Sequence, residues 1–424
     1  MSTDDTGVSV GVSSALQTLD WFDPEFRERT EFDVYALARG LPPQRSERTG
    51  EWYFLGYEDC REAFQRADVL SNNWLLGPNP LGLSTVLPEN SDGDEQREYR
   101  RLLDPLFGPK LMEDLEGDIR DYAAQLMRPI AAKSHCEFVA EFTMPFPTII
   151  FCRLMGFPLE DHPQLMRWKD VYMNSMTPFI ARQLGITDVD ADGRPSMDAV
   201  RRLTEQSAKE IIAYLSEILE ERRRRPVSDV ISMLVAIRRP DGAPLSEDEL
   251  IRICFNLFLG GLDTVTGLLS MIVKHFAAHP DDRAAFMALM DDPTRVGPAV
   301  EELVRFHSIV AIPRRATTDC VLRGAELRED DIIQVVTPAA DRDDARFPGA
   351  DHLDFERAPN PHLGFGLGLH RCLGIHLARR ELRIGLQEIH RMMPRYSLDA
   401  DDPPIVGSGG VHGLFTLPLR VGIG

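Results

Sequence analysis

The feature that most limits the fold of this chain is one long and almost uninterruptedly apolar segment, Leu250 to Val273. Ser246 and Glu249 precede it with the spacing of a capping box, and a proline follows at position 280, so we predict one helix from Ser246 to about His279. Such a helix of roughly 30 residues is about 45 Å long. Because apolar residues occupy nearly every face, the helix must be buried in a large protein or span a membrane.

The middle of this helix argues against the membrane. Residues 260–264 read Gly-Gly-Leu-Asp-Thr, and two adjacent glycines cost roughly 1 kcal/mol each inside a helix. An unpaired carboxylate at Asp263 would be expensive in lipid or in a dry core. We therefore expect the helix to loosen here and to admit something polar. Two structural alternatives stay open, namely a Thr264 hydroxyl bonded to the Gly260 carbonyl and an Asp263 paired with a distant Arg or Lys.

Asn256 is a further polar residue on this apolar stretch. It lies one turn before Gly260 and two turns before Asp263, so the three residues share a face. A hydrogen bond to a neighbouring helix and a polar contact to a bound ligand both explain it.

Composition excludes several classes of protein. The chain has 424 residues, with 47 Lys and Arg against 67 Asp and Glu, which gives a net charge of −20. A chain of this length can bury a large core without disulfides, and its acidity argues against sequence-independent binding of nucleic acid. The six cysteines are scattered without a CxxC pair, and the first residues are acidic where a signal peptide would be basic. We expect a soluble cytoplasmic protein with neither a nucleic-acid nor a membrane partner.

Helical periodicity dominates the chain, and strand signals are few. The clearest predicted helices are 114–127, 208–225 and 281–290, and the clearest predicted strands are 52–55, 332–337 and 415–421. Residues 70–91 are expected to form a long functional loop, and residues 1–12 to be disordered. The basic run 222–225 fits the C-terminus of a helix better than a nucleic-acid site. With no linker visible, we predict a single domain over residues 1–424 that is mainly α with small β-sheets.

A second informative segment lies near the C-terminus and reads Phe-Gly-Leu-Gly-Leu-His-Arg-Cys-Leu-Gly over residues 365–374. Glycines at 364, 366 and 368 allow tight turns and close approach to a flat partner. Cys372 stands at the start of a predicted helix, where the dipole and free amides stabilise a thiolate. A dinucleotide loop lacks its third glycine here, and a zinc site built from His370, Cys372 and His376 lacks a fourth ligand.

This segment resembles the heme-ligand signature FxxGxxxCxG of the cytochromes P450 at every fixed position. The resemblance implies a cytochrome P450 fold with a long buried central helix over heme b. It assigns Cys372 as the axial thiolate ligand of the iron and His370 as a partner of a heme propionate. Phe365 would pack beside the ligand sulfur, and Gly366 belongs to the same heme-binding loop.

Other segments resemble the same family in the same order, over about residues 95 to 420. The Gly260–Thr264 segment resembles the central-helix motif, whose acid–alcohol pair would be Asp263 and Thr264. Glu302 and Arg305 resemble the structural ExxR pair, with Arg357 as its third member. The residues of the Gly260–Thr264 segment, together with the following Val265 and with Gln96, are most similar to the bacterial camphor-hydroxylase type.

Two arginines, Arg314 and Arg100, match the family's propionate-binding arginines. The chain departs from the family pattern at three places. Gln96 stands where a heme-contacting His is frequent, Val265 where Thr or Ser is frequent, and Asp341 where Asn is usual.

The resemblance implies a monooxygenase that inserts one atom of O2 into a substrate. Asp263 would gate protons from solvent and Thr264 would hold the oxygen-derived group. Electrons would come from NAD(P)H through a ferredoxin reductase and a ferredoxin, because no flavin or iron–sulfur segment fits in the chain. Six basic residues fall in segments that the family places around the cysteine face, and they would suit an acidic ferredoxin or else be merely solvated. These are Arg97, Arg101, Lys110, Arg371, Arg379 and Arg380.

The substrate is predicted less sharply. The loop segments 74–78 and 81–87, together with Val310, Ile312 and Val411 by resemblance, suggest an apolar pocket with Asn256 and Gly260 on the central helix. A small lipophile, a terpenoid first, is expected, with fatty acids, steroids and aromatic compounds open. Two other functions remain, a heme-thiolate protein that binds a ligand without turnover and a peroxide-driven hydroxylase, whose family members usually lack the acid–alcohol pair.

Overall fold

The computed structural model describes residues 18–21, 31–38, 40–73, 85–190, 194–407 and 411–422. The chain divides into two compact units, which are described separately. Unit 1 comprises Met1–Trp74 and Glu301–Cys372, and unit 2 comprises Leu75–Val300 and Leu373–Gly424. Helices dominate and the sheets are small, so the predicted fold class is confirmed. The single domain over 1–424 stays a prediction, and the disorder predicted for residues 1–12 and the loop residues 74–84 fall outside the described residues.

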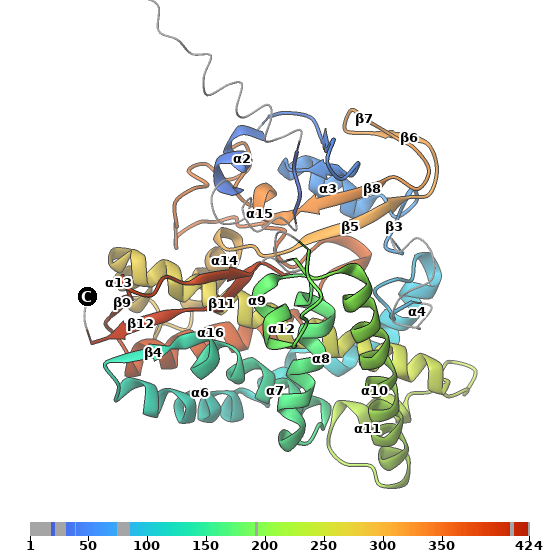
Figure 1. Ribbon diagram of the computed structural model, residues 1–424, viewed down its shortest axis with the longest axis horizontal. Coiled ribbons are helices and arrows are strands. Elements are labelled where there is room, and N and C mark those ends of the chain that lie inside the picture. Colours follow the sequence, from blue (N-terminus) through green and yellow to red (C-terminus); the bar gives the residue numbers. More distant parts are fainter. Residues whose placement is uncertain are drawn as a thin grey trace, which may run out of the picture. The chain divides into compact units, whose positions relative to one another are not determined.

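Unit 1 is built on a five-stranded sheet in the order β1-β2-β8-β5-β3 (Figure 1). Only the β2–β8 pair is parallel, and the other neighbours are antiparallel. The strands are β1 Gln44–Arg45, β2 Trp52–Phe54, β3 Leu70–Ser71, β5 Ala311–Ala316 and β8 Ile332–Val336. A separate two-stranded hairpin consists of β6 Cys320–Leu322 and β7 Ala325–Leu327. The helical elements are α2 Glu31–Ala38, α3 Tyr57–Gln65, α15 Thr337–Ala340 and the 3₁₀ turn η5 Gly368–His370.

The sheet of unit 1 is buried on both faces. Phe54 and Val335 belong to one apolar core, whereas their chain neighbours Tyr53 and Val336 belong to a second one. Successive side chains of a strand point to opposite faces, so this alternation places one core on each side. The two faces explain why strand β2 is apolar at every position and why β8 is apolar except at the buried Gln334.

Unit 2 is mostly helical. Its helices are α4 Gly93–Leu103, η2 Asp104–Phe107, α5 Pro109–Glu113, α6 Glu116–Ala131, the π-helical turn η3 Val139–Thr143, α7 Pro145–Met155, η4 Leu159–Asp161, α8 His162–Asn174, α9 Pro178–Gln183, α10 Met197–Arg224, α11 Val230–Ala236, α12 Glu247–Ala278, α13 Pro280–Met287 and α16 Ile375–Met392. Its strands form the sheet β4-β12-β9 and the hairpin β10-β11, with bounds His135–Glu137, Pro418–Val421, Tyr396–Leu398, Ile405–Gly407 and Gly413–Thr416 in that order. The chain passes between the units within α14, Val296–Phe306.

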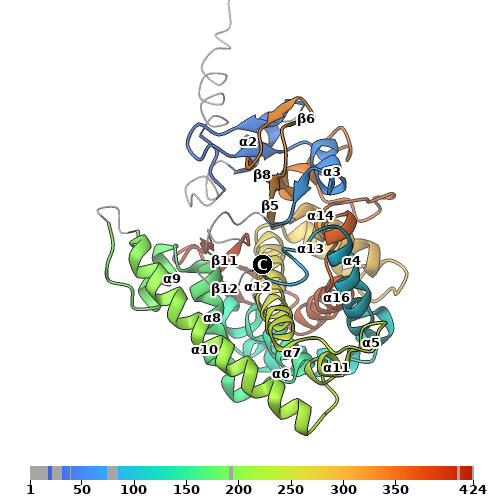
Figure 2. The ribbon, with the colours of Figure 1, turned by 90° about the vertical axis from the view of Figure 1, so that its right-hand side faces the viewer.

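Helix α12 is the central element of unit 2 (Figure 2). It contacts α7, α8, α10, α16 and β11, among others. The predicted capping box is present, because Ser246 accepts from the Glu249 amide and Glu249 accepts from the Ser246 amide. Within the described residues α12 is the one helix long and apolar enough to cross a membrane, but 67% of its most apolar window is buried. It is therefore the core helix of its unit.

The expected loosening of α12 at residues 260–264 is wrong. The helix runs unbroken from Glu247 to Ala278. The glycine at 261 has a packing role instead, because a Cβ there would lie 2.3 Å from the ring of Phe151 on α7. Gly261 thus lets two helices approach closely.

The other predicted elements agree to within a few residues, with two differences. Helix α10 begins at Met197, eleven residues before the predicted start at 208, because Ser196 caps it by accepting from the Ala199 amide. The predicted strand 415–421 is two strands in different sheets, β11 and β12. They part at Leu417, whose amide donates to Glu137 rather than to a strand of the β10–β11 hairpin.

Candidate active site

Cys372 ends a tightly folded loop in unit 1. Its amide donates to the Phe365 carbonyl at 2.9 Å, and the Gly366 amide donates to the Leu363 carbonyl at 2.7 Å. Gly366 and Gly368 both have a positive φ, of 66° and 75°, and a Cβ on Gly368 would meet the Phe64 carbonyl at 2.8 Å. The glycines of this segment are therefore required by the turn itself.

The thiol of Cys372 is the only exposed one of the six cysteines. Burial raises the pKa of the Cys136, Cys152 and Cys254 thiols to about 12, so these stay protonated and inert at neutral pH. Cys372 is thus the most accessible thiol of the chain. It lies three residues before α16 along the chain, slightly further from the helix than predicted.

The side chains available around Cys372 fit a metal that is already bound by most of its own ligands. Among the described residues, no group of three or more His, Cys, Asp or Glu side chains is arranged to hold a metal ion. A bare cation such as zinc needs three or four protein ligands, whereas heme iron needs one protein thiolate because the porphyrin supplies the rest. The single exposed thiol on a rigid glycine loop therefore fits heme and does not fit zinc.

Two other residues implied for heme binding lie in the same unit. His370 ends the turn η5 and is half-buried, two residues before Cys372. Arg314 on β5 is 3% exposed, and its guanidinium stands 5.5 Å from the centroid of the Phe64 ring. The other implied residues, Gln96 and Arg100, lie on α4 in unit 2, where Gln96 is buried and Arg100 pairs with Asp104 at 2.9 Å.

The structure brings Glu302, Arg305 and Arg357 together in a buried cluster of unit 1. The Arg305 guanidinium is fully buried and binds Glu302 through two bonds of 2.8 Å. It also donates to the backbone carbonyls of Asp341 and Ala350. Arg357 donates to the same carboxylate at 3.2 Å. The cluster ties the segments 341–357 to α14, the helix that carries Glu302 and Arg305.

Asp341 lies in this region, at the position where the family usually has Asn. Only one of its two carboxylate oxygens has a hydrogen-bond partner among the described residues. Its Oδ1 accepts from the Leu363 amide at 2.7 Å, while Oδ2 is buried without a hydrogen-bond partner in the described structure. Burial raises the pKa of Asp341 to about 6, although His362, the Leu363 amide, Ser308 and Arg305 oppose that rise. The folded chain must therefore ionise a carboxyl in an unfavourable place at neutral pH.

We expect Asp341→Asn to stabilise the protein at pH 7 by about 1–3 kcal/mol, because the amide keeps the Leu363 contact and never ionises. The unfolded chain ionises this carboxyl near pH 4 and the folded chain near pH 6, so wild-type stability falls as pH rises through this window. The gain should shrink to near zero at pH 4. Denaturant midpoints at both pH values measure it, and an equal gain at pH 4 and pH 7 would contradict the ionisation of Asp341.

The acid–alcohol segment of α12 contains both structural alternatives left open by the sequence. The Thr264 hydroxyl donates to the Gly260 carbonyl at 3.1 Å. Asp263 Oδ1 accepts from Lys169 Nζ at 3.0 Å, and the same ammonium lies 2.7 Å from Asp170. Burial alone would lower the pKa of Lys169, but the two carboxylates outweigh it and hold the pKa above its usual value. Lys169 therefore stays charged at every physiological pH.

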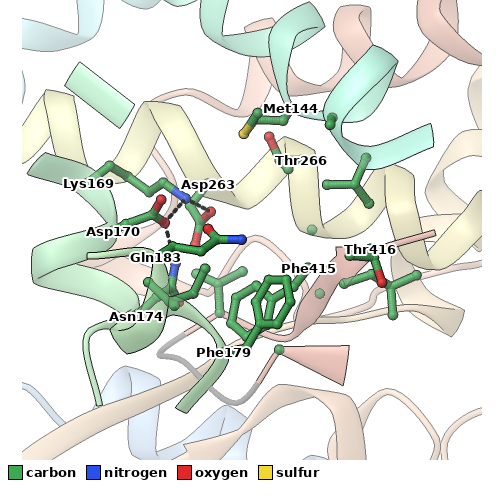
Figure 3. A pocket seen from close by; sticks show the side chains of 18 of the residues that line it. Met144, Lys169, Asp170, Asn174, Phe179, Gln183, Asp263, Thr266, Phe415 and Thr416 are labelled. Carbon is green, nitrogen blue, oxygen red and sulfur yellow. Dashed lines mark hydrogen bonds and ion pairs between the residues drawn. The ribbon is translucent and has the colours of Figure 1, made fainter. Parts of the chain in front are cut away.

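Asp263 also faces a cavity that lies wholly in unit 2 (Figure 3). Of the predicted substrate-contacting residues, Val411 lines this cavity, while Asn256 and Gly260 on α12 do not. Val310 and Ile312 belong to unit 1, where Val310 directly precedes β5 and Ile312 is the second residue of that strand.

Sequence reasoning missed Lys169 and Asp170. A signal was present, because Lys169 falls at helical spacing from Leu165 and beside Trp168, both buried on α8. A lysine at a core position of an amphipathic helix indicates a buried partner. Nothing in the sequence indicated that the partner would be Asp263, 94 residues further along the chain.

Three of the six basic residues expected to dock a redox partner have acidic neighbours. Arg97 pairs with Asp94 at 2.7 Å, and Lys110 lies 3.8 Å from Asp114. Arg380 is only 18% exposed and pairs with Glu116. The local positive charge is therefore smaller than the sequence indicated.

Comparisons with known proteins agree with the geometry of the cysteine loop. The sequence model of the family described as Cytochrome P450 matches residues 84–288 and 296–407. The chain is 31% identical over 392 residues to the mycinamicin IV hydroxylase/epoxidase of Micromonospora griseorubida, covering 90% of this chain and 92% of that protein. It is 31% identical over 386 residues to the methyl-branched lipid omega-hydroxylase of Mycobacterium tuberculosis, covering 87% and 84%.

Solved structures agree as well. The cytochrome P450 PksS of the Bacillus subtilis 168 bacillaene polyketide synthase aligns with a TM-score of 0.81 at 27% identity, covering 95% of this chain and 100% of that one. P450BioI, solved with an acyl carrier protein ligated to hexadec-9Z-enoic acid, aligns with a TM-score of 0.80 at 26% identity, covering 94% and 99%. With a family match over most of its length and hydroxylases among its relatives, the chain belongs to the cytochrome P450 family of heme monooxygenases.

Proposed function

We propose that this chain inserts one atom of O2 into a small lipophilic substrate, with electrons that reach it from NAD(P)H through a ferredoxin reductase and an acidic ferredoxin. The observation that carries the proposal is the buried Asp263–Lys169 pair directly before Thr264 on α12. A protein that only binds a ligand has no need for a costly carboxylate at that position, and an oxygen-reducing enzyme needs a proton donor there.

In this proposal Cys372 is the thiolate ligand of the iron, with Phe365 and Gly366 shaping the loop around it. His370, Arg314, Arg100 and Gln96 hold the edge of the heme, the cationic ones through its propionates. When bound, heme supplies the activation of O2, and a thiolate ligand favours cleavage of the O–O bond.

Asp263 and Thr264 would handle the protons. The Asp263 carboxylate is 13% exposed, so it can exchange a proton with water in the cavity, and Lys169 holds it in one place. The Thr264 hydroxyl donates a hydrogen bond to the Gly260 carbonyl, and it can rotate to donate instead to a polar group beside the helix. Breaking the Lys169 contact releases Asp263 to carry a proton inward.

Thr264→Ala is expected to leave heme content and NAD(P)H consumption intact but to reduce product formed per NAD(P)H about tenfold, with peroxide released instead. The factor corresponds to losing one hydrogen bond of roughly 1–1.5 kcal/mol. Product, peroxide and NAD(P)H are measured together. Thr204→Ala is the matched control, because it removes the hydroxyl of a buried threonine on helix α10 that does not line the cavity beside Asp263. Unchanged coupling in the Thr264 variant would contradict the proton-delivery role.

For the substrate we propose a small lipophile, a terpenoid first. The name of one relative, a methyl-branched lipid omega-hydroxylase, supports a lipophilic class. Optical titration with terpenoids, fatty acids, steroids and aromatic compounds tests this. One class should move the Soret band from low to high spin. A Soret band that no lipophile moves would contradict the lipophilic substrate class.

The proposal of an acidic ferredoxin as the electron donor depends on Arg97 and Arg101 of α4, which are exposed basic residues on a chain of net charge −20. Reduction by a ferredoxin should slow steeply as salt is added, since exposed charges are screened beyond about 10 Å at 0.1 M salt. A salt-independent reduction rate would contradict charge-guided docking.

A further inference from the structure

His362 connects helix α14 to the cysteine loop within unit 1. Its side chain is only 4% exposed, and Nε2 lies 3.2 Å from Oε2 of Glu301 on α14. Its Nδ1 accepts a hydrogen bond from the Gly364 amide at 3.2 Å. Because Nδ1 is the acceptor in that bond, the proton of the neutral ring is on Nε2, which donates it to Glu301. The imidazole is therefore held at both of its nitrogens.

The Gly364 peptide, which His362 binds, is packed closely against α14. A Cβ at position 364 would lie 2.9 Å from Cγ1 of Val304 and 3.1 Å from the Ser308 hydroxyl, so the backbone lies directly on this end of the helix. The preceding amide, that of Leu363, donates to the buried Asp341 side chain at 2.7 Å. Two successive amides at the start of the loop are thus held by side chains.

From Gly364 the contacts continue to Cys372. Phe365 is the next residue, and its ring centroid lies 5.8 Å from that of His362. The Phe365 carbonyl accepts from the Cys372 amide at 2.9 Å. A displacement of Gly364 would carry Phe365 and this carbonyl with it, because the two residues are adjacent. The position of the Cys372 backbone therefore depends on the bond that His362 makes.

We propose that His362 is a positioning residue for the thiolate ligand. By binding the Gly364 amide it holds Phe365 and Cys372 in the arrangement that keeps water from the sulfur. The inference rests on the proposed function, in which Cys372 ligates heme iron. Water that reached the thiolate would donate hydrogen bonds to it and reduce the charge it gives to iron, which favours the ferrous state. Loss of the His362 bond should therefore raise the reduction potential of the iron.

Two substitutions at position 362 separate its two bonds. His362→Asn places an amide oxygen near the position of Nδ1, so it keeps an acceptor for the Gly364 amide and loses the donor to Glu301. His362→Gln places an amide nitrogen near the position of Nε2, so it keeps the donor to Glu301 and loses the acceptor for Gly364. Glu301 is 24% exposed, and water can replace its lost donor. Only the Gln variant should release the loop.

Two measurements on the holoprotein test this. Hydrogen–deuterium exchange over residues 363–372, followed by mass spectrometry, should be about tenfold faster in His362→Gln, which is about the effect of one hydrogen bond on a local opening equilibrium. The reduction potential of the iron should rise by about 59 mV, the equivalent of a tenfold change for a one-electron couple. His362→Asn should match the wild type in both measurements.

Gly364→Ala tests the same step without changing His362. The added methyl group would push the peptide away from Val304, so this variant should act like His362→Gln, and it keeps the proposal testable if His362→Gln does not fold. His352→Gln is the control at an exposed histidine of the same unit and should change neither measurement. Equal effects of the Asn and Gln variants would overturn the proposal. Faster exchange with an unchanged potential in His362→Gln would overturn it too, because the contact would then be merely structural.

The outcomes separate this inference from the proposed function. A wild-type protein that hydroxylates a lipophile, with Asn and Gln variants that behave alike, would overturn the inference alone. Both expected shifts in His362→Gln, in a protein that forms no product from any lipophile, would overturn the proposed function alone.

Discussion

Replacing Cys372 with serine is expected to abolish the thiolate-type Soret band of the reduced, CO-bound protein and to lower turnover by more than about 100-fold. Loss of a group that merely supports a metal ligand costs about 10–100-fold, and Cys372 is proposed as the ligand itself. The fold should survive, because the side chain is exposed and surface substitutions usually change stability by less than about 0.5 kcal/mol.

Cys320→Ser is the matched control for that experiment. Cys320 lies on β6 of the same unit and is partly exposed, so it is the next most accessible thiol. Its replacement should leave the spectrum and turnover unchanged. A Cys372→Ser protein that keeps the thiolate-type band would contradict the assignment, as would loss of that band in Cys320→Ser.

Arg305→Ala is expected to lower the free energy of unfolding by about 3–5 kcal/mol, which is the usual cost of removing one partner from a buried ion pair. The variant leaves the Glu302 carboxylate, 1% exposed, with one arginine instead of two. It also removes the donors to the carbonyls of Asp341 and Ala350. Denaturant unfolding followed by circular dichroism measures the effect as a lower midpoint.

The pair Arg97–Asp94 provides a control with the same spacing along a helix. Both side chains are mostly exposed, so Arg97→Ala should cost no more than about 1 kcal/mol. Equal shifts in the two variants would show that burial does not determine the strength of the Glu302–Arg305 pair.

Helix α12 illustrates how much of the fold was predictable. Its start follows from Ser246 and Glu249, which form a local capping box, and its burial follows from apolarity on every face. What the sequence could not show is why Gly261 is there. The reason is the ring of Phe151, which is brought against α12 by tertiary packing.

In the candidate site, too, the local features were predictable from the sequence and the long-range contacts were not. The loop around Cys372 was predictable because its turns are local and its glycines are required by backbone conformation. The partner of Asp263 was not, since Lys169 reaches it from another helix. The strand predicted over residues 415–421 was wrong as a single strand for a similar reason, because Leu417 bonds to Glu137 on a distant segment.

The central claim is that this chain reduces O2 and transfers one of its atoms to a substrate. It is tested most directly by turnover under oxygen-18 gas, with the redox partners supplied and a substrate identified by optical titration. The account predicts one labelled oxygen atom in each product molecule. Unlabelled product under oxygen-18 gas, with label appearing only from oxygen-18 peroxide, would contradict it in favour of a peroxide-driven enzyme. No product from a substrate that shifts the Soret band would contradict it in favour of a ligand-binding protein.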